Sequence, residues 1–390
     1  MLGAFRRIVK QPQARHAFLM GFGMAVLANS RPYEGMVLSL LTMATLLAWM
    51  VGRGSLPMRV SLRRIMLPVS IVLALTALGM GFYNWRVTGD TLRMPYMVHE
   101  ETYAVAPVFL WRQTSPEPAY RHKEIRDLHI GWSLPIYTAQ RSAASFLRQS
   151  VNRILFLAQS YFTPIVLLAR VRYQQVALAI LLATMLWVLR KDRWGRLALL
   201  FSILFTIALL PETWMLSHYT APAAGLFFVL GLQTARHLRW WRWRKIPVGQ
   251  FAVWAILVLF TVSLVSFYVD LSRADGETPW EFQRARILAH LKQDEGRHLV
   301  IVRYGPNHSP HHEWVYNDAH IDGAKVVWAR EMDATQNRKL LGYFKDRRVW
   351  LLEADAEPPK LVPYSVEIDH TEDSVRVLLD IKTASLMNYK

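Results

Sequence analysis

Long uncharged stretches alternate with short clusters of arginine and lysine over the first 269 residues of the chain. A helix needs about 20 mainly apolar residues to cross the hydrocarbon core of a bilayer, and about 17–25 residues is the usual range. The uncharged stretches that reach or approach this length are 16–30, 35–52, 65–85, 154–169, 173–189, 197–211, 213–235 and 246–269. The pattern predicts a multi-pass α-helical membrane protein.

The basic clusters predict how these spans are oriented. They fall at 6–15, 53–64, 190–196 and 236–245. The positive-inside rule places all of them on the cytoplasmic side, so only one crossing fits between the loop 84–150 and the cluster at 190–196. Because Pro164 interrupts 154–169, we interpret that stretch as an interfacial or re-entrant helix and 173–189 as the crossing.

This topology has about seven spans in the cell inner (plasma) membrane. The N-terminus is then cytoplasmic, while the long loop 84–150 and the C-terminal part are extracytoplasmic. A hairpin over 154–189 is the alternative, and it would invert the orientation of every later span.

The chain changes character after Val269. The residues beyond it include 20 acidic and 17 basic side chains, whereas the whole chain has a formal charge of +17. The stretches 298–303, 326–329 and 349–353 read as buried strands, 333–344 has helical spacing, and 375–381 is a candidate fourth strand. We therefore predict a transmembrane domain over 1–269 and a small soluble extracytoplasmic α/β domain over 270–390.

Composition excludes several other classes of protein. The chain contains no cysteine, which removes disulfide scaffolds, thiolate catalysis and cysteine-ligated zinc. The basic residues lie between apolar stretches rather than on one polar face, so we expect membrane lipids and no nucleic acid as partners.

Two polar breaks between apolar stretches are candidate binding regions at the outer face. The first contains Arg31, Tyr33 and Glu34, and the second contains Glu212 and the pair His218-Tyr219. Ionisable groups at such a depth are energetically unfavourable and are usually functional, and an arginine fork suits a phosphate or carboxylate. A helix turn in which Arg31 and Glu34 merely pair, with Tyr219 in an aromatic belt, is the structural alternative.

The loop 84–150 is too long to be a simple connection. It interleaves aromatic, basic and acidic side chains that suit a sugar or a lipid phosphate, namely His99, Glu100, Glu101, Tyr103, Tyr120, Arg121, His122 and Arg126. A carboxylate from Glu100 or Glu101 could act as a general base. The alternative is a solvated loop with interfacial aromatics.

Histidine and carboxylate residues also gather at 308–313 and at Asp318, His320 and Asp322. Such a density invites a divalent-metal hypothesis, but Pro310 breaks any helical face and no HExxH spacing is present. We favour a polar loop and expect no cofactor.

Several of these segments together resemble bacterial integral-membrane glycosyltransferases of the GT-C class. The Arg31-Pro32-x-Glu34-Gly35 turn, the aromatic outer loop and the late His218-Tyr219-x-Ala221-Pro222 carry the resemblance. Within the class the chain is similar to relatives of the dolichyl-phosphate-mannose protein mannosyltransferases and the lipid A aminoarabinose transferases. The matching stretches are 28–35, 97–111, 120–126, 214–223 and 307–331.

The resemblance implies that a sugar passes, with inversion, from a polyprenyl-phosphate donor to an envelope acceptor at the outer membrane face. Members of the class carry an essential acid in their first outer loop, and here no Asp or Glu precedes Glu34. The chain thus resembles the C-terminal two-thirds of such an enzyme. We expect the acid from upstream sequence, from a partner subunit, or from Glu34, Glu100 or Glu101. The alternative function is a non-catalytic membrane scaffold whose external tail binds a protein or glycan.

Overall fold

The computed structural model describes residues 1–52, 57–162, 192–273 and 279–365. The chain divides into two compact units. The first contains Met1–Ala119 and His129–Ser272, and the second contains Tyr120–Leu128 together with Arg273–Lys390. The predicted crossing at 173–189 and the candidate strand at 375–381 lie outside the described residues, as do residues 163–169 of the stretch 154–169.

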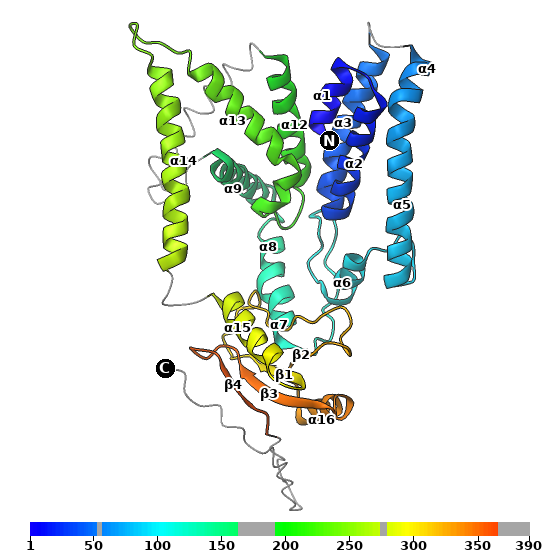
Figure 1. Cartoon of the computed structure of the whole chain (residues 1–390), viewed down its shortest axis with the longest axis vertical. Helices are drawn as coiled ribbons and strands as arrows, with labels where there is room; N and C mark the ends of the chain where they lie inside the picture. The colour runs from blue at the N-terminus through cyan, green and yellow to red at the C-terminus, as the bar shows by residue number, and fades with distance from the viewer. Residues whose placement is uncertain (53–56, 163–191, 274–278, 366–390) are drawn as a thin grey trace, which may run out of the picture. The chain divides into compact units, whose positions relative to one another are not determined.

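The first unit is helical (Figure 1). Its helices are α1 (Leu2–Lys10), α2 (Ala14–Ser30), α3 (Pro32–Val51), α4 (Met58–Ser61), α5 (Leu67–Thr88), α6 (Pro95–Tyr103), α8 (Leu134–Thr138), α9 (Ala143–Phe162), α12 (Arg193–Leu209), α13 (Ala224–Leu238) and α14 (Val248–Arg273). A π-helical turn, η1 (Leu62–Met66), joins α4 to α5, and a second, η2 (Asp127–Ser133), precedes α8. A 3-10 helix, η3 (Ser217–Ala223), precedes α13.

Three segments among the described residues are long and apolar enough to cross a membrane: Pro32–Val51, Met58–Thr88 and Val248–Val269. In the predicted span 213–235, the 3-10 helix η3 contains Pro222 and continues directly into α13. Pro222 has no backbone N–H, and its ring disfavours an α-helix through this position. The α13 helix that follows has 15 residues, which corresponds to about 22 Å at 1.5 Å per residue. That length falls short of a hydrocarbon core of about 30 Å.

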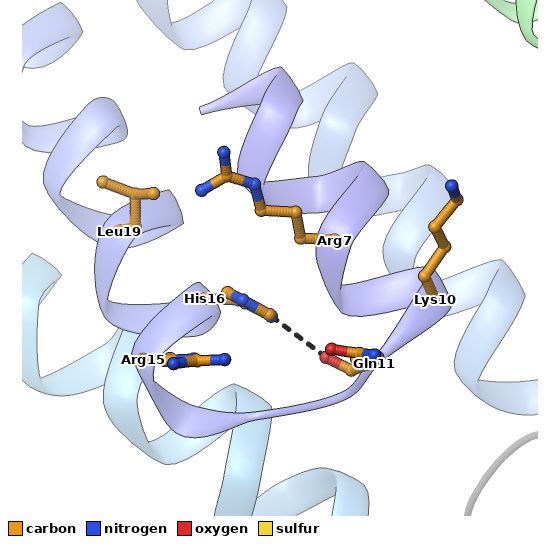
Figure 2. A pocket seen from close by; sticks show the side chains of 6 residues that line it. All are labelled: Arg7, Lys10, Gln11, Arg15, His16 and Leu19. Atoms are coloured by element: carbon orange, nitrogen blue, oxygen red, sulfur yellow. Dashed lines mark hydrogen bonds between the residues drawn. The ribbon is translucent and has the colours of Figure 1, made fainter.

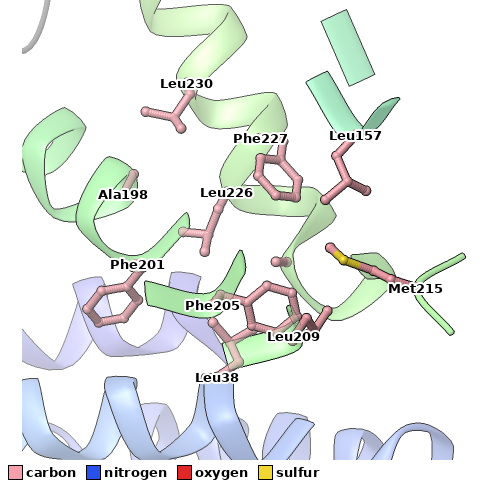
Figure 3. Close-up of a cluster of buried hydrophobic side chains, with 11 residues drawn as sticks. Leu38, Leu157, Ala198, Phe201, Phe205, Leu209, Met215, Leu226, Phe227 and Leu230 are labelled. Atoms are coloured by element: carbon pink, nitrogen blue, oxygen red, sulfur yellow. The ribbon is translucent and has the colours of Figure 1, made fainter. Parts of the chain in front are cut away.

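Glycines let α2 pack closely on its neighbours. A Cβ atom on Gly21 would lie 3.0 Å from the Val72 Cβ of α5, and one on Gly35 would lie 2.8 Å from the Leu27 Cβ of α2. One buried cluster joins α1, α2, α3 and α5 around Ile8, Met20 and Leu46. The second joins α3, α9, α12 and α13, with Leu38, Leu157, Phe205 and Leu226 converging in its interior (Figure 3).

The second unit is built on a small sheet with the strand order β2-β1-β3-β4. Its strands are β1 (Arg297–Arg303), β2 (Val326–Arg330), β3 (Arg347–Glu353) and β4 (Lys360–Pro363), and its helices are α7 (Lys123–Arg126), α15 (Trp280–Gln293) and α16 (Ala334–Tyr343). The first three strands are parallel, and β4 pairs antiparallel with β3. The predictions of strands at 298–303, 326–329 and 349–353 and of a helix at 333–344 are confirmed.

The central strand β1 is buried on both faces, as expected for a parallel strand covered on each side. Val300 and Val302 pack with Leu291 of α15 and with Trp314. Leu299 and Ile301 face the other way and pack with Phe344 and the partly buried Leu340 next to it. The sheet therefore lies between α15 and α16.

Asp333 caps α16, because its Oδ1 accepts a hydrogen bond from the Gln336 N–H at 2.8 Å. We predict that Asp333→Ala lowers the local stability of this helix by about 1 kcal/mol. Hydrogen exchange of the α16 amides, measured in the full chain, should then accelerate about 5-fold. Asp333→Asn retains an acceptor and should exchange as the wild type does. Equal exchange in all three proteins would contradict a role for this cap.

Candidate functional site

The turn that follows α12 is fixed by a short ladder to an early segment of the chain. Leu110 N–H donates to the Pro211 carbonyl at 2.9 Å, and Thr213 N–H donates to the Val108 carbonyl at 2.7 Å. The Thr213 hydroxyl donates to the Pro107 carbonyl at 2.5 Å. Two segments about a hundred residues apart in the chain thus hold Glu212 in one position.

Arg153 of α9 holds the same turn from another direction. Its guanidinium donates to three backbone carbonyls: Leu210 at 3.1 Å, Glu212 at 3.0 Å and Thr213 at 2.6 Å. Gln140 adds a bond from its Nε2 to the Thr213 carbonyl at 3.1 Å. The planar fork of an arginine suits this task because several donors point in fixed directions. The turn is therefore rigid, and its carbonyls are satisfied.

The carboxyl group of Glu212 is buried in this turn, with 4% of the residue exposed. Burial, and then the negative charge of Glu34, raise the pKa of Glu212 to about 8, although the cations Arg31 and Arg153 oppose the shift. Its Oε2 has no hydrogen-bond partner among the described residues. A carboxyl group with these properties carries its proton near neutral pH and can exchange it there.

The junction of α2 and α3 supplies the second carboxyl group. Pro32 occupies the first turn of α3, and this places Glu34 in that turn with 5% of the residue exposed. The Arg31 Nη1 lies 3.3 Å from the Glu34 Oε1, and the Arg31 guanidinium stacks 4.2 Å from the centre of the Tyr219 ring. Arg31 thus neutralises Glu34 on one side and contacts η3 on the other.

Tyr33 links this junction to the turn. Its hydroxyl donates to the Ala208 carbonyl of α12 at 2.6 Å. Its ring packs against Phe109 at 4.8 Å, and Phe109 in turn stacks on Trp111 at 4.4 Å. The structure thus brings together three predicted residues, Arg31, Tyr33 and Glu34, with predicted Tyr219, which contacts His218 at 4.9 Å.

A pocket of about 430 Å³ opens beside the turn. Its walls include Trp132 and Trp214, whose rings are nearly parallel at 6.4 Å, and the polar side chains of Gln140, Gln149 and Arg153. The Gln140 Oε1 and the Trp214 Nε1 are buried without a hydrogen-bond partner among the described residues. Buried polar atoms normally have a partner, and both of these atoms belong to residues that line the pocket.

The predicted residues of α6 form a separate group. His99, Tyr103 and His129 make a ring cluster with centroid distances of 5.1 to 6.3 Å. Glu101 is exposed and pairs with Arg93. Burial raises the pKa of Glu100, so Glu100 is the more suitable proton-transfer group of the two glutamates predicted in the outer loop.

The remaining predicted loop residues, Tyr120, Arg121, His122 and Arg126, belong to the second unit. Burial and the charge of Arg330 lower the pKa of His122. Next to it, Lys123 Nζ lies 3.3 Å from the Pro306 carbonyl oxygen. The loop 84–150 therefore contributes to both units rather than to one site.

In the histidine-rich segment 308–313, His308 and Glu313 already bond to other residues of the second unit. His308 Nδ1 lies 2.7 Å from Asp355 Oδ1, and Glu313 accepts from the Tyr304 hydroxyl at 2.6 Å and pairs with Arg330. Within the described ranges, no group of three or more His, Cys, Asp or Glu side chains is arranged to hold a metal ion.

Sequence reasoning missed Arg153 and the two glutamines of the pocket. Arg153 immediately precedes the uncharged stretch 154–169 and lies in an amphipathic helix. A cation at such a border is usually assigned to the aqueous side, and only its tertiary contacts show that it is turned inward. The signal that could have identified it is its position among apolar neighbours, since a charge in such a setting needs a partner.

No protein-family model matches this chain, and neither a curated protein nor a solved structure matches it. The interpretation of the site therefore depends on its geometry and on the sequence patterns described above.

Replacing Glu212 by Gln should change how stability depends on pH. The pKa of Glu212 is about 8 in the fold and 4.5 in its absence, so wild-type stability falls as the pH rises through that interval. Glu212→Gln removes the titration. The variant should match the wild type near pH 4 and exceed it by an amount on the order of a few kcal/mol above pH 8. Thermal unfolding in detergent at several pH values measures this difference.

The exposed Glu295→Gln is the matched control and should follow the wild-type curve. Parallel curves for the wild type and Glu212→Gln between pH 5 and 8 would contradict the raised pKa.

Proposed function

We propose that this chain is a membrane glycosyltransferase of the GT-C type. It transfers a sugar from a polyprenyl-phosphate donor to a hydroxyl group of an envelope acceptor. The observation that carries the proposal is the pocket lined by Trp132 and Trp214, which adjoins the turn holding the buried Glu212. The sequence resemblance to that class points to the same chemistry.

The pocket walls suit a sugar ring. Aromatic faces pack against the apolar C–H faces of a sugar, as the parallel Trp132 and Trp214 rings would. The amide of Gln149 can donate to and accept from sugar hydroxyl groups. The volume of about 430 Å³ lies within the ordinary range for small-ligand sites, about 300–1,000 Å³.

The two carboxyl groups supply acid–base chemistry. Burial and the negative charge of Glu34 disfavour ionisation of Glu212. In its ionised form Glu212 accepts the proton of the acceptor hydroxyl. The acceptor oxygen bonds to the anomeric carbon while the bond from that carbon to the phosphate oxygen breaks. The lipid phosphate leaves with the bonding electrons, and the anomeric configuration inverts.

Cations next to this pair suit the departing phosphate. Arg31 has 30% of its side chain exposed and borders Glu34. A guanidinium group can donate two parallel hydrogen bonds to a phosphate, which stabilises the charge that develops as the bond breaks. Arg31 is therefore the residue proposed to bind the donor phosphate, together with the adjoining Tyr219.

In this proposal the chain crosses the inner membrane about seven times, and the site faces the outer side. Three apolar helices support membrane association. The basic clusters support the orientation, because the positive-inside rule places the cluster at the start of α2 on the cytoplasmic side. If α2 crosses the membrane, its other end, next to Arg31, lies on the outer side.

The carboxyl pair is tested by sugar transfer in membranes that contain the full chain, with a panel of synthetic polyprenyl-phosphate sugars as donors. We predict that Glu212→Gln and Glu34→Gln each lower the transfer rate by about 100-fold or more. The wild-type rate should increase as the pH rises through about 8, because Glu212 then loses its proton and can act as the base. Glu281→Gln, in the second unit, is the control. Correctly inserted wild-type protein that transfers no sugar from any donor would contradict the proposal and favour the scaffold alternative.

The sugar pocket is tested separately. Trp214→Ala should raise KM for the donor about 10-fold through the loss of one aromatic wall, with a smaller effect on kcat. Trp254→Ala is the matched control, since Trp254 lies on α14 and is 67% exposed. If the two substitutions change KM equally, the pocket does not hold the sugar.

A further inference from the structure

A second hollow lies at the opposite end of α2 from Arg31. It has a volume of about 700 Å³ and is lined by Arg7, Lys10, Gln11, Arg15, His16 and Leu19 (Figure 2). The α2 helix has 17 residues, so its two ends are about 25 Å apart at 1.5 Å per residue. The hollow is therefore distinct from the proposed sugar site.

The positive charge of the hollow comes from the residues at which α1 and α2 meet. Arg7 and Lys10 come from the last turn of α1, and Arg15 and His16 come from the first turn of α2. The short connection 11–13 brings these turns together, and the α1–α2 contact keeps them close. Figure 2 shows the side chains around one opening.

No acidic side chain in the described part of the chain pairs with Arg7, Lys10 or Arg15. The sequence has no Asp or Glu before Glu34. Three cations that line one hollow without an ion-pair partner repel one another, so an anion bound in the hollow would reduce that repulsion.

The start of α2 adds to the positive potential. Gln13 is the N-cap residue and makes no side-chain cap hydrogen bond. The first amide groups of a helix point outward and carry the positive end of its dipole. His16 is buried, with 9% exposed, and its Nδ1 lies 3.0 Å from the Gln11 carbonyl oxygen. Because a carbonyl only accepts, Nδ1 is the donor, and this bond fixes the connection across the hollow.

An exposed apolar surface continues from the hollow along α2. Leu19 lines the hollow and is 46% exposed, while Phe18 and Phe22 are 43% and 62% exposed. Residues three and four apart share one face of a helix, so Phe18 and Phe22 lie below Arg15 along that face. An acyl chain can lie against the two rings while its headgroup enters the hollow.

We propose that this hollow binds a phosphate group and that the phosphate is the headgroup of an anionic phospholipid. Arg7, Lys10 and Arg15 hold the phosphate oxygens, and the α2 amides complete the site. The adjoining apolar face favours a lipid over free phosphate as the source. The site would anchor the α1–α2 hairpin at the membrane surface, independently of any sugar transfer.

The test uses the purified full chain in a zwitterionic detergent, titrated separately with phosphatidylglycerol, phosphatidylcholine and inorganic phosphate. Native mass spectrometry counts retained lipid, and the thermal unfolding midpoint reports binding of any of the three. We expect phosphatidylglycerol to be retained at least 10-fold better than phosphatidylcholine. The triple variant Arg7→Gln, Lys10→Gln, Arg15→Gln should lose roughly 100-fold in affinity for phosphatidylglycerol.

The matched control is the triple variant Arg59→Gln, Arg63→Gln, Arg64→Gln, which removes the same charge from exposed positions on α4 and η1. It should keep its affinity within a few-fold of the wild type. Stabilisation by phosphatidylglycerol but not by inorganic phosphate supports a lipid site. If phosphatidylglycerol and inorganic phosphate stabilise the protein equally, and the Arg7, Lys10 and Arg15 variant loses both effects, the hollow binds phosphate but the lipid part of the proposal is wrong. Equal losses in the two variants, or no preference for phosphatidylglycerol, would overturn the proposal.

Discussion

The fork of Arg153 across the turn at 210–213 is the interaction on which the architecture of the first unit depends. A turn in an apolar environment cannot leave its carbonyl groups without hydrogen bonds. Arg153 satisfies three of them, and the ladder to 107–110 satisfies Pro211 and orders the amide of Thr213. With the backbone fixed in this way, Glu212 has one position in which to be buried. The pocket and its aromatic walls follow from the same constraint.

Glu212 can be buried because its carboxyl group can be protonated and therefore uncharged. A permanently ionised carboxylate at this depth would need a dedicated partner, whereas a protonated one needs far less compensation. Arg31 lies closest to Glu34 and therefore compensates that residue more directly. Glu212 is the carboxyl group that burial and the charge of Glu34 keep protonated near neutral pH. This asymmetry is what gives the pair a proton to exchange near neutral pH.

The sequence pattern determined much of the fold because its signals are local. The continuous apolar runs of the strands in the second unit and the spacing of α16 are visible in short windows, and the structure confirms them. The long apolar helices α3, α5 and α14 can also be recognised directly in the sequence. The number of membrane spans in the whole chain is harder to predict from the sequence. The helices α2, α12 and α13 are short, and how deeply each lies in the membrane depends on what it packs against.

The sequence by itself also determined that Arg31, Glu34, Glu212 and His218 are unusual, since polar groups between apolar stretches require an explanation. It could not determine that Glu34 and Glu212 influence each other, nor that Arg153 turns inward. These relations join segments separated by 60 to 180 residues. The periodicity of apolar residues in the sequence does not show which helix ends meet. Only the packing of α3, α9 and α12 decided it, because close-packed side chains fix the distance between groups that the chain keeps far apart.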